Sequence, residues 1–206
     1  MIRNMLLIVL LAASTGGEKF LEEIPLYQKE SYFKAKVYAQ HDWKSFFELK
    51  EANAVVNPDD YDLHLLNAAV FFATNRLRAE KKQKQLLFSA PLRDAAVVHS
   101  WQMAEKKFLN HFNNRVPKLR SPNDRMQLFG VPETTEGENI DWNSIEPGTT
   151  YAQVAKLIVD DFFHSSEHRK TMLSKSFTRL GCAAVFETKD KDGVRYFKAT
   201  QNYASQ

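Results

Sequence analysis

The stretch Gly137-Glu138-Asn139-Ile140 is the part of this 206-residue chain around which the other polar signals are arranged. A helical segment ahead of it ends in Phe108-Leu109-Asn110-His111, and a second one after it runs into Ser165-Ser166-Glu167-His168-Arg169. One carboxylate therefore has a histidine on either side in the sequence. Imidazoles and carboxylates bind metal ions and transfer protons. We expect folding to bring His111, Glu138 and His168 into one cleft, with Asn139 fixing the backbone beside it.

Composition indicates a folded protein with a sizeable core, since 44% of the residues are hydrophobic and 12% are aromatic. The formal charge is only +3, and the densest basic run, Lys81-Lys82-Gln83-Lys84, is typical of a solvated helix end. We therefore expect no nucleic-acid partner. The sequence has no P-loop, dinucleotide glycine fingerprint, zinc-finger spacing or internal repeat.

The first residues have the pattern of a secretory signal. Arg3 precedes an apolar run over residues 5–13, and small residues follow it up to Gly17. We interpret residues 1–16 as a signal peptide, with a retained anchor or buried helix as the alternative. The run is short for a membrane span, so we expect no transmembrane span in the mature chain. The predicted location is secreted, periplasmic or cell envelope. Cys182 is the only cysteine, which excludes an intrachain disulfide.

Two further segments follow the predicted signal peptide. Residues 17–57 are rich in aromatic side chains and predict an N-terminal helical extension of one or two helices that packs on the main domain. A partner-binding arm is the alternative. Asn57-Pro58-Asp59-Asp60 marks the boundary and has the residue types of a helix start. Residues 58–206 then form the main domain.

The sequence of the main domain predicts helices first and a β-hairpin last. Ser89 is a candidate cap for a second helix, Thr150 with Gln153 has capping-box spacing for a third, and Ser165 or Ser166 can cap a short fourth one. Residues 180–186 and 194–203 predict the hairpin strands. Apolar residues occupy both faces of the first strand, so Cys182 is interpreted as a core residue and not as a nucleophile. His99 lies on an apolar helical stripe and is expected to be a core histidine, whereas His111 is placed in the last turn of its helix.

The order and spacing of several motifs resemble a known family. They are Asn75-Arg76-Leu77-Arg78-Ala79, His99-Ser100, Arg125 with Gly130, Gly137-Glu138-Asn139-Ile140, Ser165-Ser166-Glu167-His168-Arg169 and Gln201-Asn202-Tyr203. Together they resemble the CAP domain of SCP-like extracellular proteins, a superfamily of cysteine-rich secretory, antigen 5 and plant pathogenesis-related proteins. The resemblance covers about residues 60 to 205. The cysteine-poor pattern is similar to that of the bacterial branch.

The resemblance implies an α+β fold, a three-layer α-β-α sandwich with a small antiparallel sheet between helical layers. It also implies a cleft that contains His111, Glu138 and His168. Many relatives carry a second glutamate three residues after a tryptophan in the third helix. Phe162 and Ser165 stand at those positions here, so one carboxylate of the pattern is missing. This departure weakens the argument for acid–base catalysis.

Three functions stay open for this cleft. His111 and His168 could bind a divalent metal, zinc first of all, with Glu138 orienting a histidine or acting as a base. The missing acid favours a binding module, and the resemblance implies a sterol-like or fatty-acid-like ligand or a protein or cell-envelope partner. A metal-dependent hydrolase of protease type is the second possibility. A structural or interaction protein with a relic site is the third, so whether the chain is an enzyme is left open.

Overall fold

The computed structural model describes residues 16–132, 136–188, 190 and 193–205. The predicted signal peptide, residues 1–16, lies outside the described residues except for Gly16. Within the described ranges, no helix has both the length and the apolar character needed to cross a membrane.

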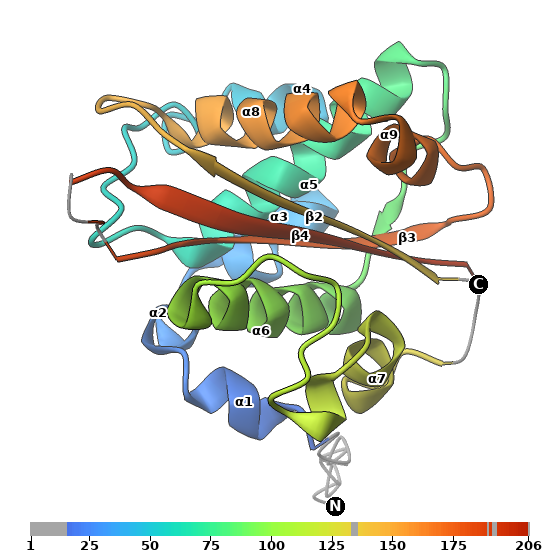
Figure 1. Cartoon of the computed structure of the whole chain (residues 1–206). Coiled ribbons are helices and arrows are strands. Elements are labelled where there is room, and N and C mark those ends of the chain that lie inside the picture. The colour runs from blue at the N-terminus through green and yellow to red at the C-terminus, as the bar shows by residue number, and fades with distance from the viewer. Residues whose placement is uncertain (1–15, 133–135, 189, 191–192, 206) are drawn as a thin grey trace, which may run out of the picture.

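A four-stranded sheet lies between two layers of helices (Figure 1). The strands are β1 (Leu87–Phe88), β2 (Glu136–Ser144), β3 (Arg179–Phe186) and β4 (Tyr196–Ala204), and their order across the sheet is β1-β3-β4-β2. Strands β2, β4 and β3 pair antiparallel, as expected, but β1 pairs parallel to β3. The sheet is therefore mixed, because the two residues Leu87 and Phe88, shortly before α6 (Ala90–Lys106), add a short parallel strand at the edge.

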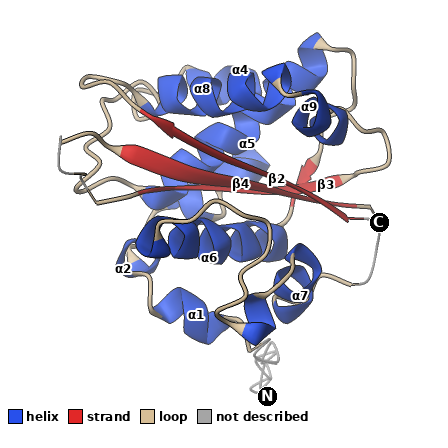
Figure 2. Ribbon diagram, in the orientation of Figure 1, coloured by secondary structure: helices blue, strands red, loops and turns tan. Residues whose placement is uncertain are grey.

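The helices cover both faces of the sheet and form the three-layer sandwich (Figures 1 and 2). On one face α6 packs on β3 and β4, with α7 (Pro122–Leu128) beside it. On the other face lie α5 (Leu63–Glu80), α8 (Tyr151–His164) and α9 (Ser166–Met172). Strand β3 is second in the sheet order and almost wholly buried, and Cys182 within it is 1% exposed. Burial raises the pKa of its thiol, so Cys182 is the inert core residue that the sequence predicted.

Side-chain caps set the helix starts. Ser89 caps α6, and Thr150 with Gln153 forms the predicted capping box of α8. The predicted helix start at Asn57 is wrong, because Asp62 caps α5 by accepting from the N–H groups of His64 and Leu65. Asn57 instead closes a turn, in which its side chain accepts from the N–H of Asp59 at 3.1 Å. Asparagine and aspartate favour turns and helix caps alike, so the local sequence did not separate the two positions.

The N-terminal extension consists of several short helices and not of one or two. They are α1 (Glu18–Glu22), α2 (Pro25–Gln28), η1 (Tyr32–Lys34), α3 (Val37–Gln40) and α4 (Trp43–Phe47). Each one is too short to be stable alone, so packing must hold it. Tyr27, Phe33 and Phe46 are buried in the same core as the sheet and helices. The Tyr27 hydroxyl also donates to Asp94 of α6 at 2.7 Å. Packing on the main domain, the favoured interpretation, is what the structure shows.

Candidate functional site

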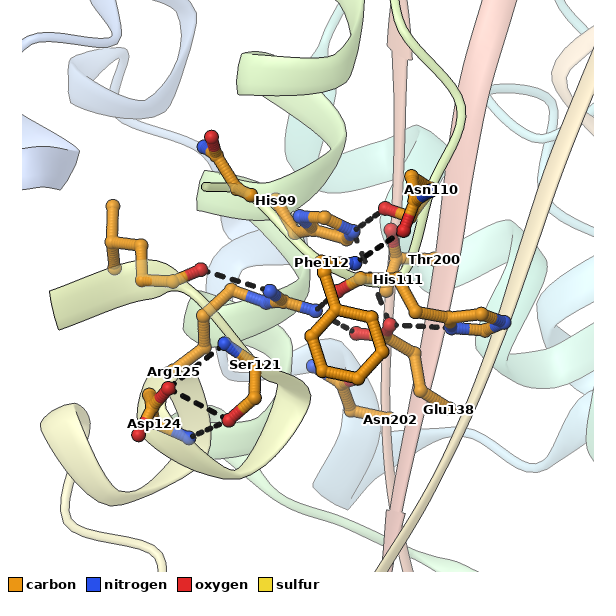
Figure 3. Close-up of polar contacts among 12 residues, drawn as sticks. His99, Asn110, His111, Phe112, Ser121, Asp124, Arg125, Glu138, Thr200 and Asn202 are labelled. Carbon is orange, nitrogen blue, oxygen red and sulfur yellow. Dashed lines mark hydrogen bonds and ion pairs between the residues drawn. The ribbon is translucent and has the colours of Figure 1, made fainter. Parts of the chain in front are cut away.

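Glu138 is held between two basic side chains on the α6 face of the sheet (Figure 3). Its side chain is 2% exposed. One carboxylate oxygen, Oε2, lies 2.7 Å from Nη2 of Arg125, and the other, Oε1, lies 2.8 Å from Nδ1 of His111. Burial alone would raise the pKa of Glu138, but the hydrogen bond from His111 and the charge of Arg125 hold it below its usual value. Glu138 is therefore a carboxylate whose two oxygens both have partners.

Arg125 joins Glu138 to the loop that carries His111. A capping box between Ser121 and Asp124 starts α7 and sets the position of Arg125 in its first turns. The guanidinium is fully buried and donates to the carbonyl oxygens of His111 and Leu119, each at 3.0 Å. Sequence reasoning did not include Arg125 among the site residues. The signal that could have found it is an arginine in the polar connection that precedes Glu138. A buried arginine needs a carboxylate to pair with its charge.

His111 lies in a loop and not in the last turn of a helix. Helix α6 ends at Lys106, because Lys107 takes a left-handed conformation with φ of 49°. The prediction that places His111 in the last turn of its helix is therefore wrong. Since Glu138 accepts the hydrogen of Nδ1, the other ring nitrogen, Nε2, is left for a ligand, and Figure 3 shows it turned away from the carboxylate. The side chain is 41% exposed.

His99 holds the same loop through the backbone of Asn110. Its ring is fully buried, with Nε2 lying 3.1 Å from the carbonyl oxygen of Asn110 and 3.9 Å from Oε1 of Glu138. Burial lowers the pKa of His99 to about 4, so the ring is neutral at pH 7. His99 is a core histidine, as the sequence predicted, and it holds the residue that precedes His111.

His168 approaches the edge of the sheet from the opposite face. It lies in α9, and its backbone carbonyl accepts a hydrogen bond from the buried side chain of Asn139 at 3.1 Å. Burial lowers the pKa of the His168 ring, and the nearby His111 lowers it further. Among the described residues, His168 has no hydrogen bond or ion pair with Glu138. The fold thus joins His111 to Glu138 directly and places His168 across β2 from them.

Neither Ser165 nor Asp161 supplies the second carboxylate of the family pattern to the histidines. Ser165 precedes α9 but makes no side-chain capping bond. Asp161, one turn earlier, accepts from the side chain of Asn143 at 2.8 Å. Within the described part of the chain, no group of three or more His, Cys, Asp or Glu side chains is arranged to hold a metal ion. Of the predicted site, the two imidazoles of His111 and His168 remain as candidate metal donors.

Asp161 also interacts with Asp141 of β2, on the α8 face of the sheet. Burial, and after it the charge of Asp161, raise the pKa of Asp141 to about 6. One oxygen of Asp141 is buried without a hydrogen-bond partner among the described residues. When protonated, Asp141 can share its hydrogen with Asp161 in a hydrogen bond, and this contact is lost when Asp141 ionises as pH rises through about 6.

We expect Asp141→Asn to stabilise the protein at pH 7.5 by about 1–2 kcal/mol. The pKa of Asp141 in the folded chain, about 6, exceeds that of an unfolded aspartate, so its protonated form stabilises the fold at low pH and this contribution is lost as pH rises through 6. Urea unfolding at pH 7.5 and pH 4.5 measures the effect, which should be clearly smaller at the lower pH. Glu146→Gln, at an exposed acid, is the matched control. Equal gains at both pH values would contradict the shared proton.

Comparison with known proteins agrees with this architecture. The model of the cysteine-rich secretory protein family, CAP, matches residues 71–203. A Bacillus subtilis protein described as uncharacterized protein YkwD is 31% identical over 112 residues, which are 54% of this chain and 39% of that protein. The chain thus spans less than half the length of this relative.

Two solved structures share the fold. An extracellular protein containing a SCP domain from Bacillus anthracis has a TM-score of 0.53 and 25% identity, over 74% of this chain and 45% of that one. An outer surface protein from Borrelia burgdorferi has a TM-score of 0.51 and 14% identity, over 66% and 90% of the two chains. The second likeness concerns the fold alone. On the family match, the chain belongs to the CAP (cysteine-rich secretory protein) family, in its bacterial branch.

Proposed function

We propose that this CAP domain is a secreted or cell-envelope binding module whose cleft, formed by His111, Glu138 and His168, recognises a ligand without cleaving it. The observation that carries the proposal is the burial of the Glu138 carboxylate between His111 and Arg125. A general base needs a free lone pair within reach of its substrate. Both oxygens of Glu138 are engaged, and its side chain is 2% exposed, so it is suited to orient His111. The solved structure described as an extracellular protein containing a SCP domain supports the location.

The surroundings of His111 suit an apolar or mixed ligand. Leu109 is 46% exposed and Phe112 is 54% exposed, and both lie in the same short loop as His111. Exposed apolar side chains gathered at one place commonly mark a binding surface. Imidazoles beside them can add hydrogen bonds to a polar group of the same ligand.

A probe titration tests whether the cleft binds. Imidazole NMR signals of His111 and His168 are followed while fatty-acid vesicles or soluble cell-wall fragments are added to the full chain. We expect one probe class to shift both signals saturably and to be recovered unchanged. His111→Ala and His168→Ala assign the signals, and the exposed His164→Ala is the control. Probe hydrolysis that disappears in His168→Ala would instead support the hydrolase.

A divalent metal at the cleft is a second candidate, favoured by the contact between Glu138 and His111. A carboxylate on one ring nitrogen commonly orients a metal-binding histidine and strengthens its other nitrogen as a ligand. His111 and His168 would hold the ion, which would supply Lewis acidity when bound. Two protein donors are fewer than the three that catalytic zinc sites use, so the residues fit a weak binding site better than a hydrolytic one.

We expect zinc to bind with an affinity that falls by about 10- to 100-fold in Glu138→Gln, because that change removes the orienting charge. His111→Ala should abolish the saturable signal, since it removes one of the two donors. Isothermal titration with zinc, with calcium and magnesium as comparisons, measures both effects. His41→Ala, in the N-terminal extension, is the control. His99 is unsuitable, because replacing its buried ring would disturb the core. Equal zinc binding in all variants would refute the site.

A further inference from the structure

Strand β2 is the outer strand of the sheet, at the end opposite to β1. It is nine residues long and pairs with β4 along its whole length. No described strand lies on its other side. An outer strand carries backbone N–H and C=O groups that a further extended chain can pair with.

The hydrogen-bond register shows which backbone groups of β2 face outward. On the β2 side of β4, the N–H of Ile145 donates to the carbonyl oxygen of Arg195, the residue that precedes β4, at 3.2 Å. On the β3 side, the N–H of Glu187 donates to the carbonyl oxygen of Tyr196 at 2.8 Å. Antiparallel pairing alternates, so odd-numbered residues of β2 bond to β4 and even-numbered ones point away from it. The side chain of Asn143 occupies the N–H of Ser144 at 2.8 Å, and the N–H of Trp142 interacts with the carboxylate of Asp141. Among the described residues, no side chain occupies the outward N–H groups of Glu138 and Ile140 in this way.

The exposed surface of Glu138 is mostly backbone. Glu138 is partly exposed as a residue although its side chain is only 2% exposed. Ile140 keeps 7% exposure, whereas Thr200, its partner within the sheet, has none. Solvent therefore reaches the main chain of β2 at Glu138, next to His111.

The site residues stand on both sides of this edge. His111 contacts Glu138 from the α6 face, with Phe112 next to it in Figure 3. His168 lies on the opposite face, where its carbonyl is bound by Asn139. A chain paired with Glu138 and Ile140 would run along this edge, with His111 on one face and α9, which carries His168, on the other.

We propose that the ligand of the cleft is an extended peptide segment that adds to the edge of β2 between His111 and His168. This inference rests on the proposed binding function and specifies its ligand class. Outward N–H and C=O groups recur along a strand every second residue, about 6.8 Å apart, and an extended polypeptide offers the matching pattern. A sterol or fatty acid has no such series of donors and acceptors. The exposed ring of Phe112 supplies a side-chain contact beside that ladder.

N-methyl scanning of a peptide tests the proposal. A display library of linear twelve-residue peptides is selected against the full chain, and an enriched peptide is synthesised with single N-methyl groups along its length. We expect methylation to weaken binding by about tenfold or more at alternate residues and to be tolerated between them, because only every second N–H faces β2. The His111 and His168 NMR signals should shift on binding. Loss at every residue or at none would overturn the proposal.

Variants of the edge give a second readout. Ile140→Pro removes an outward N–H that the sheet does not use, and Ile140→Val keeps it. We expect only the proline variant to lose the selected peptide, with circular dichroism showing that both are folded; if it does not fold, the methyl scan decides. Failure to select any peptide while vesicles or cell-wall fragments still shift the histidines would overturn this inference and leave the binding function standing. Concentration-dependent pairing of two copies through β2 would also overturn it.

Discussion

Glu138→Ala is expected to lower the free energy of unfolding by about 3–5 kcal/mol, because it leaves the buried guanidinium of Arg125 without its counter-charge. Arg125 is fully buried and its charge faces Glu138 at 2.7 Å. The remaining partners of Arg125 at the site are carbonyl oxygens, which cannot neutralise it. Urea unfolding, followed by tryptophan fluorescence at pH 7, measures the loss. His111 should lose its fixed ring orientation in the same variant.

A double-mutant cycle separates this ion pair from general damage. Arg125→Met alone should cost a similar amount, and the double variant should cost clearly less than the sum, since it leaves no unpaired charge. Glu136→Gln is the matched control, because Glu136 lies two residues earlier on the same face of β2 and burial raises the pKa of its carboxyl. We expect that control to change stability by less than about 0.5 kcal/mol. Additive losses in the cycle would contradict the pairing.

Locally encoded features of this fold could be predicted from the sequence. The caps at Ser89 and Thr150 and the strand around Cys182 depend on side chains within a few residues of each other. The end of α6 could not be placed, because Lys107 adopts the left-handed conformation that glycine or asparagine usually signals. His111 was therefore assigned to a helix that had already ended.

The site could be predicted only in part, for a related reason. The motif order indicated His111, Glu138 and His168. The charge partner of Glu138 is Arg125 in α7, and no local sequence pattern signals a pair between two separate elements. Arginines are rarely fully buried, so Arg125 was not expected inside. The mixed sheet was missed for the same reason, since Leu87 and Phe88 become a strand only through β3.

Gly181→Ala is expected to destabilise the protein by about 3 kcal/mol or more, because α6 packs against β3 where only a hydrogen fits. A β-carbon at Gly181 would lie 2.0 Å from the backbone nitrogen of Arg93 and 2.3 Å from the carbonyl carbon of Leu92. Backbone atoms cannot move away by changing a rotamer, so α6 itself would have to shift. Asn202 fixes the same turn by donating to the carbonyl of Leu92 at 3.2 Å.

Two other glycines provide graded controls for Gly181→Ala. A β-carbon at Gly137 would lie 2.8 Å from the ring of Phe177, a side chain that can turn, so Gly137→Ala should cost less. Gly148 has open space but a φ of +85°, and alanine there should cost about 1 kcal/mol. Thermal and urea unfolding should therefore rank Gly181 above Gly137 and Gly148. Because α6 carries His99, which holds Asn110 beside His111, Gly181→Ala should also move the His111 NMR signal, whereas Gly148→Ala should not. An unchanged stability and signal in that variant would show that α6 can move away from β3 at little cost.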